Sequence, residues 1–211
     1  FLAAVELFNR GTLLPNIGVS LFRILAGFVL GSVVAIPLGL LIGVSITARH
    51  IFDPYIHFLR FIPALALTSL FLVWFGVGEE SKIIQVMYAT AFIVIMNTAT
   101  GVVTTHKNKR LAAQTLGANA WQIFWLVTVP AAIPSIYVGM RLALAGSFLV
   151  IVAVEMLAAE SGLGYLIWTS KVYFKIDWMF VGIFMLGLFG LLADVGWKAI
   201  GRNLIGRFVR E

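Results

Sequence analysis

Cysteine is absent from this chain, and charged residues are scarce. The 211 residues include no Cys, and only 11% are Asp, Glu, Lys or Arg, whereas 61% are hydrophobic. The lack of Cys excludes disulfide bonds and thiolate metal sites. Soluble domains carry about 25% charged residues. The composition therefore excludes an ordinary soluble domain and predicts a membrane protein.

The motifs of several enzyme classes are also missing. The chain has no G-x-x-x-x-G-K-[ST] phosphate loop, no H-E-x-x-H zinc motif and no G-x-S-x-G nucleophile motif. His50, Asp53 and His57 have helical spacing, but Pro54 interrupts them and no further ligand lies nearby, so we expect no metal site. We therefore expect neither enzyme activity nor a cofactor bound by this chain. Energy for uphill transport would have to come from a partner on the cytoplasmic face.

Long uncharged apolar runs are what the sequence has in abundance. A hydrocarbon core of ~30 Å requires about 20 apolar helical residues. The runs are continuous rather than alternating as in the strands of a membrane barrel. We predict an all-α polytopic membrane protein with one transmembrane domain, residues 1–211, and five spans at about 17–46, 61–78, 83–105, 134–157 and 178–200.

Positive charge falls on alternate connections between these spans. The basic segments are Arg49–Arg60, Lys107–Arg110 and the tail from Lys198 to Arg210, whereas Glu79–Lys82 and Glu160–Asp177 are acidic or mixed. By the positive-inside rule the basic connections and the C-terminus are cytoplasmic. The net charge of +6 then reflects topology and not a nucleic-acid partner. This orientation places Phe1 outside, and because the chain opens on Phe rather than Met, we expect a sixth span to precede it.

Small and polar residues inside the spans indicate helix packing and a solute pathway. Small residues recur at every fourth position of the first span, which allows another helix to approach closely: Gly27, Gly31, Ala35, Gly39 and Gly43. Arg23, Asn97, Arg141 and Glu155 are candidates for the pathway or its gate. Arg141 and Glu155 are separated by about 21 Å of helical rise and about 40° of rotation, so they share a face without pairing. Arg141 would extend to the membrane surface, form a structural ion pair, or face an anionic solute.

The segment Leu111–Pro134 lies between two expected spans but does not resemble one. Its sequence, LAAQTLGANAWQIFWLVTVPAAIP, is uncharged and holds two Trp, and we expect it to end at its prolines, Pro130 and Pro134. Leu116, Trp121, Phe124 and Trp125 partly follow helical spacing, which predicts two short amphipathic helices divided at Gly117. Helices that lie in lipid headgroups normally carry Lys or Arg, and this segment has none. Docking against a protein is therefore favoured over an interfacial helix.

This segment resembles the conserved loop of binding-protein-dependent ABC transporter permeases. Ala112-Ala113, Gly117, Val127 and Val129-Pro130 follow the pattern E-A-A-x3-G-x9-I-x-L-P at its full spacing and between the usual spans, although Leu111 replaces the leading Glu. The surrounding segments FIPALALTSLFLVWFGVGEESK and VAVEMLAAESGLGYLIW are similar to the nitrate, sulfonate, taurine and bicarbonate permeases. The resemblance covers residues 16–205, and members of this family normally have six spans.

The resemblance implies a type I ABC importer permease of a bacterial inner membrane. It also implies a cytoplasmic coupling-helix loop at about 111–130. ATP and Mg would act in separate ATP-binding subunits. A second permease copy would complete the path, and a solute-binding protein would face the loop Glu160–Asp177. The residues implied to contact the ATPase are Ala112, Ala113, Gly117, Ala118, Trp121, Gln122, Trp125 and Pro130. The alternatives are an ATP-independent channel or secondary transporter, an ABC permease for a non-anionic solute, and a membrane enzyme.

Overall fold

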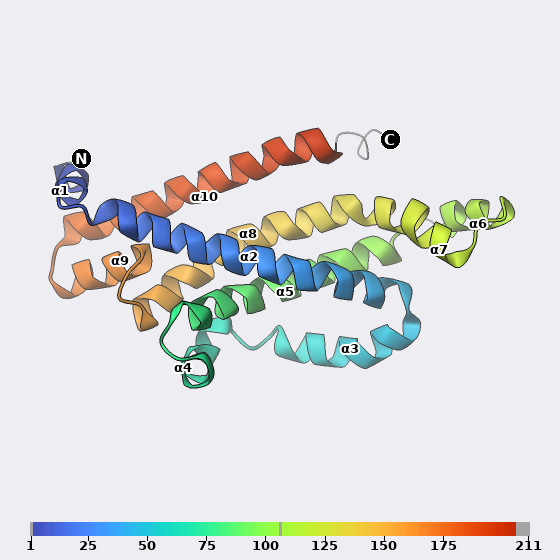
Figure 1. The fold of residues 1–211 in the computed structure, drawn as a ribbon, viewed down its shortest axis with the longest axis horizontal. Coiled ribbons are helices and arrows are strands. Elements are labelled where there is room, and N and C mark those ends of the chain that lie inside the picture. Colours follow the sequence, from blue (N-terminus) through green and yellow to red (C-terminus); the bar gives the residue numbers. More distant parts are fainter. Residues whose placement is uncertain (1, 106, 206–211) are drawn as a thin grey trace.

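The computed structural model describes residues 2–105 and 107–205, and in these residues all regular structure is helical. Figure 1 shows an elongated bundle in which α2, α5 and α8 run side by side. The elements are α1 (Leu2–Asn9), α2 (Leu13–Val44), α3 (Ile46–Leu59), the 3₁₀ helix η1 (Ala64–Leu67), α4 (Thr68–Phe75), α5 (Glu79–Val103), α6 (Lys107–Thr115), α7 (Ala120–Ile123), the π-helix η2 (Phe124–Thr128), α8 (Val129–Ala158), α9 (Leu163–Val172) and α10 (Ile176–Ile205).

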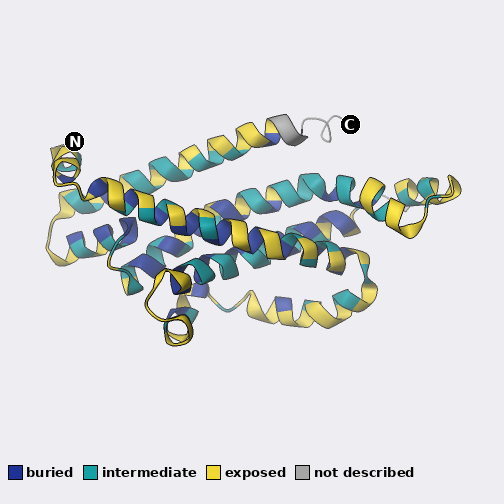
Figure 2. Cartoon of the chain, in the orientation of Figure 1, coloured by how far each residue is buried: buried dark blue, intermediate teal, exposed yellow. Residues whose placement is uncertain are grey.

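Four long helices form the body of the bundle. The segments long and apolar enough to cross a membrane are Leu13–Val44, Glu79–Val103, Ala120–Ala158 and Ile176–Arg202. Of the 18 consecutive residues that are most apolar in each helix, 44% are buried in α2 but only 11% in α10. α2 is therefore central and α10 is peripheral. Figure 2 shows the same gradient, with buried residues concentrated along α2, α5 and the middle of α8.

The expected small-residue stripe is confirmed as the contact between α2 and α5. A Cβ atom built on Gly31 would lie 2.8 Å from the carbonyl oxygen of Met87 and 2.9 Å from Cβ of Thr90. Similar Cβ atoms on Gly27, Gly39 and Gly43 would meet Val86, Thr98 and Val102 of α5. In a bilayer, two helices gain little hydrophobic free energy when they pack together, because lipid is as apolar as their side chains. The close approach of the two backbones therefore supplies the packing energy through van der Waals contacts.

Gly31→Ala should destabilise the fold, and Gly196→Ala should stabilise it. The Gly31 methyl group would push against the α5 backbone and cost about 1–3 kcal/mol. A Cβ on Gly196 of α10 meets nothing within 4 Å, so the same change there should add about 0.5–1 kcal/mol through helix propensity. Denaturation of the purified chain in detergent micelles measures both effects. Equal shifts in the two variants would contradict the close packing of α2 on α5.

The second expected span, at about 61–78, differs from the structure. Residues 46–59 form α3, where a basic connection was expected, and the helical segment Ala64–Phe75 follows after a bend of 83°. The reason is local: Pro63 has no amide hydrogen and restricts Ile62 to extended conformations, so a helix cannot continue through this point. If the bent pair is one span, the chain has up to five.

The segment Leu111–Pro134 was expected to end at Pro130 and Pro134, and this expectation is also wrong. Both prolines lie inside α8, which continues directly from α7 and η2, so Ala120–Ala158 is a single helical stretch of 39 residues. The amide of Val129 bonds to the carbonyl of Phe124, five residues back. This wider π turn lies directly before Pro130, at a point where a normal turn would lose a hydrogen bond to the proline.

The other end of the bundle is closed by α1, α9 and α10. The apolar run Tyr165–Trp168 lies within α9. Leu163 and Leu166 of α9 are buried with Leu7 of α1 and Val181 of α10. Figure 1 places this cluster of elements at the end opposite α6 and α7.

Candidate functional site: the helical tip, the ion pairs and the family

The segment between α5 and α8 protrudes from one end of the bundle (Figure 1). Gly117 has φ of +80°, a left-handed conformation that glycine adopts without strain. The amide of Ala118 donates to the carbonyl of Ala113, and that of Gly117 donates to Gln114. This pair of bonds is a Schellman motif, which ends α6. The predicted break at Gly117 is therefore confirmed, but the helix that follows it is not short, because α7 continues through η2 into α8.

A capping box begins α7. Asn119 Oδ1 accepts a hydrogen bond of 2.8 Å from the amide of Gln122, and the amide of Asn119 donates to Gln122 Oε1 at 2.9 Å. The two side chains satisfy amides that would otherwise lack partners at the helix start. Gln122, which was expected to contact a partner, therefore also fixes the direction in which α7 leaves the turn.

Exposed aromatic rings cover this helical tip. The Trp121 and Trp125 rings are 5.7 Å apart, and the two residues are 69% and 48% exposed. Phe124 packs against Trp125 with 5.0 Å between ring centroids. Of the other expected coupling residues, Ala112 and Gly117 are exposed, and Ala113, Ala118 and Pro130 are half-buried. The structure thus brings the expected residues together at one end of the molecule, although Pro130 lies at its base.

The tip is attached to the bundle by polar and apolar contacts. The Arg110 guanidinium donates to the carbonyl oxygen of Val102 at the end of α5, at 3.0 Å. A cavity of about 310 Å³ lies between α6 and η2, and Val44 at the end of α2 lines it as well. The tip is therefore bonded to α5 and lies beside the end of α2, in addition to its continuous connection with α8.

Arg141 forms a structural ion pair, one of the alternatives left open by its sequence position. Its guanidinium contacts both carboxylate oxygens of Asp194 on α10, at 2.6 and 3.1 Å. Lys198 contacts the same carboxylate at 2.8 Å. These contacts join α8 to α10, which has few other buried side chains.

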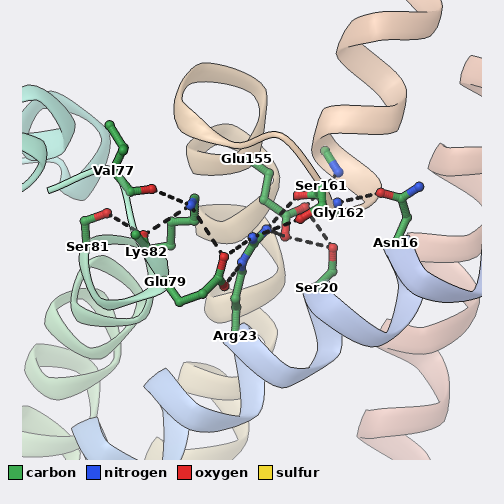
Figure 3. Close-up of polar contacts among 12 residues, drawn as sticks. Asn16, Ser20, Arg23, Val77, Glu79, Ser81, Lys82, Glu155, Ser161 and Gly162 are labelled. Carbon is green, nitrogen blue, oxygen red and sulfur yellow. Dashed lines mark hydrogen bonds and ion pairs between the residues drawn. The ribbon is translucent and has the colours of Figure 1, made fainter.

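Arg23 and Glu155 are the centre of a buried ion cluster, which we define as Arg23, Glu79, Lys82 and Glu155 (Figure 3). Arg23 is 1% exposed and Glu155 is fully buried, and their side chains are 2.8 Å apart. Arg23 also contacts both carboxylate oxygens of Glu79, at 2.5 and 2.6 Å. Lys82 lies 3.6 Å from Glu79. The cluster joins α2, α5 and α8 with two positive and two negative charges.

The turn between α8 and α9 wraps around the Glu155 carboxylate (Figure 3). The amide of Gly164 donates to Glu155 Oε2 at 2.9 Å, and Ser20 Oγ donates to the same carboxylate at 2.8 Å. The carbonyl of Ser161 accepts from Arg23 at 2.7 Å. Gly162 has φ of +117°, and a Cβ there would collide with the carboxylate. Each buried charge therefore has several hydrogen-bond partners, as a buried ion pair requires.

Ser20 and Glu79 were missed by the sequence interpretation, although a signal was present. Arg23 is the only charged residue between Arg10 and Arg49, and a lone charge within a span needs a partner. Ser20 lies one helical turn before it on the same face. Asn97, the remaining pathway candidate, donates to the carbonyl of Ile93 on its own helix at 2.8 Å and lines a cavity beside α3.

Three known proteins are similar to this chain. A probable ABC transporter permease of Brucella melitensis is 38% identical over 201 residues, which cover 95% of this chain and 82% of that protein. The taurine transport system permease protein TauC of Escherichia coli is 34% identical over 203 residues, covering 96% and 74%. The solved inward-facing MetNI methionine ABC transporter has a chain that matches with a TM-score of 0.80 at 17% identity, covering 90% of this chain and 95% of that one.

These similarities confirm the resemblance seen in the sequence and the predicted fold class. The likeness to the methionine transporter shows the fold, a helical permease bundle of the type I importers, and the permeases of Brucella and Escherichia coli are transport components rather than enzymes. Residues 27–206 match the description "binding-protein-dependent transport system inner membrane component". The chain belongs to this family of multi-pass inner-membrane permeases.

Proposed function

We propose that this chain is the membrane subunit of an ATP-driven importer, in which a separate ATP-binding subunit docks on the tip formed by α6, α7 and η2. The exposed aromatic tip carries this proposal. Exposed aromatic side chains are typical anchors of protein interfaces. The chain has no phosphate loop of its own, so an ATPase partner with bound ATP and Mg would supply the energy.

The proposed orientation places the tip and the C-terminus in the cytoplasm. Lys109 and Arg110 lie in the first turn of α6, within the tip, in agreement with the positive-inside rule. The turn between α8 and α9, and the helix α9 itself, lie at the opposite end of the bundle (Figure 1). A solute-binding protein would therefore approach α9 from outside.

The proposed solute is a small anion, and a second permease copy would complete its path. The similarity to a taurine permease supports this class. The peripheral helix α10 and the outer faces of α3 and α4 leave much apolar surface for lipid and for a second copy. Closure of the ATPase subunits would move the tip, and rocking of the bundles would switch access from one side to the other.

Co-expression with an ATPase and a secreted binding protein encoded beside this chain tests the proposal. The ATPase should co-purify with the chain, and proteoliposomes of the assembly should accumulate solute only when ATP and the binding protein are present. A preparation in which the ATPase is expressed without this chain is the control for non-specific capture. Full uptake by the chain reconstituted alone would contradict the proposal and would favour a channel or a secondary transporter.

A further inference from the structure

A cavity lies where the path of the chain bends between α3 and η1. Its volume is about 570 Å³, and its wall combines the bend with α5 and one residue of α8. Its lining residues include Arg60, Phe61, Ala89, Phe92 and Asn97. Broken helices in transporters commonly surround the solute site, because the interruption exposes polar groups at mid-membrane depth.

Arg60 lines this cavity with an exposed side chain, although its sequence position had suggested a cytoplasmic connection. α3 has 14 residues, which correspond to about 21 Å of helical rise. α3 runs back along the bundle from the end that carries the tip and ends near the middle (Figure 1). Arg60 directly follows the last residue of α3, so a hydrocarbon core of ~30 Å that begins near the start of α3 would place Arg60 inside the membrane and not at its surface.

Among the described residues, Arg60 differs from the two other arginines of the membrane region in having no carboxylate partner. Arg23 is bound by Glu79 and Glu155, and Arg141 is bound by Asp194. The Arg60 guanidinium lies only over the Phe61 ring, 4.8 Å from its centroid. None of the described residues that line the cavity is Asp or Glu. A charged side chain at this depth is costly without a partner, so its presence indicates a functional role.

Two neighbouring polar side chains complete the arrangement. The hydroxyl of Tyr88 donates to the carbonyl of Leu59 at 2.7 Å, which holds the end of α3, and therefore Arg60, against α5. Asn97 uses one amide hydrogen for Ile93, and its second amide hydrogen remains as a donor. The rest of the wall is apolar or aromatic, including Phe92, Ile93 and Met96.

We propose that this cavity binds the oxyanion group of a small organic solute on the transport path. The planar Arg60 guanidinium would form paired hydrogen bonds with a sulfonate or carboxylate. The apolar wall would contact the organic part of the solute. This inference rests on the proposed transport function and names the position and the chemistry of its solute site.

Cysteine labelling tests the proposal without knowledge of the natural solute. Because the chain has no Cys, Ala89→Cys places a single thiol on the cavity wall. The probes are 2-sulfonatoethyl methanethiosulfonate, which is itself a small organic sulfonate, and the cationic 2-(trimethylammonio)ethyl analogue. The rate at which each probe modifies the thiol is measured with the full chain in membrane vesicles and divided by the rate of the same probe with a free thiol in solution. The corrected rate should be on the order of tenfold higher for the anionic probe than for the cationic one. Arg60→Gln should remove this preference, and Arg60→Lys should retain it.

Ala145→Cys is the matched control. It lines a second cavity, of about 460 Å³ between α8 and α10, that also contains an arginine, but there Arg141 has a carboxylate partner, Asp194, which it shares with Lys198. The preference for the anion should therefore be weaker at this position than at Ala89→Cys. The proposal is overturned if Arg60→Gln leaves the preference at Ala89→Cys unchanged, or if neither reagent reacts there while both react at Ala145→Cys. Since labelling requires no ATPase, an anion preference without ATPase co-purification would contradict only the ABC importer proposal.

Discussion

Glu155→Gln should destabilise the folded chain by about 3 kcal/mol or more, the usual cost of removing one partner from a buried ion pair. The glutamine has nearly the volume of the glutamate, so the change removes charge with little effect on packing. Arg23 would keep Glu79 as a partner but would face a neutral group on its fully buried side. Equilibrium unfolding of the purified chain in mixed micelles measures the loss.

Two further variants distinguish charge from packing at this cluster. Glu79 is half exposed, so Glu79→Gln should cost less, because water can replace part of the lost interaction. The double variant Arg23→Met, Glu155→Met removes both buried charges and should recover most of the stability lost in Glu155→Gln. If Glu155→Gln cost no more than Glu79→Gln, the buried pair would not determine the stability of this end.

The buried cluster and the tip are connected by one helix. The stretch Ala120–Ala158 carries Trp121 and Trp125 near its start and Glu155 near its end, which corresponds to about 58 Å of helical rise. Glu155 pairs with Arg23 of α2, and Arg23 in turn pairs with Glu79 of α5. A displacement of the docked tip would therefore move α8 together with the far ends of α2, α5 and α9. This rigid connection suits the rocking motion that we propose.

Much of the fold was predictable because long apolar runs can be recognised as membrane-spanning helices without knowledge of their tertiary contacts. The runs that became α2, α5, α8 and α10 stand out by length alone, and the glycine spacing of the first identified the face that packs on α5. The bent pair α3 and α4 was mispredicted for a physical reason. The two short helical segments on either side of Pro63 are together long and apolar enough for one span, and the apolar pattern of the sequence does not show the bend between them.

The candidate site was predictable only where its chemistry is local. The turn at Gly117 and the exposed Trp residues depend on neighbours within a few positions, and they were identified from the pattern. The partners of Arg23 lie 56 and 132 residues away along the chain, and no periodicity encodes such a separation. Arg60 was assigned to a basic connection because charge counting along the sequence contains no measure of depth, which the length of α3 later supplied.

The aromatic tip should lose its ATPase when the exposed tryptophan is shortened. Trp121 is 69% exposed and makes its ring contacts within the tip, so Trp121→Ala should leave the bundle folded. Truncation of an aromatic anchor costs an interface about 2 kcal/mol or more, which corresponds to an affinity about 30-fold lower. Titration of the purified ATPase against the chain in nanodiscs measures this loss.

Trp74→Ala is the matched control for the docking assignment, because it replaces the same residue type at nearly the same exposure, 65%, on α4. α4 lies away from the tip (Figure 1), so the affinity for the ATPase should not change. Adding Trp125→Ala to Trp121→Ala should weaken docking further, but by less than the sum of the single effects, because the two rings are in contact and contributions of neighbouring residues are not additive. Unchanged affinity in the double variant would show that the ATPase docks elsewhere, whereas equal losses in Trp74→Ala and Trp121→Ala would show an effect of the bundle rather than of the tip.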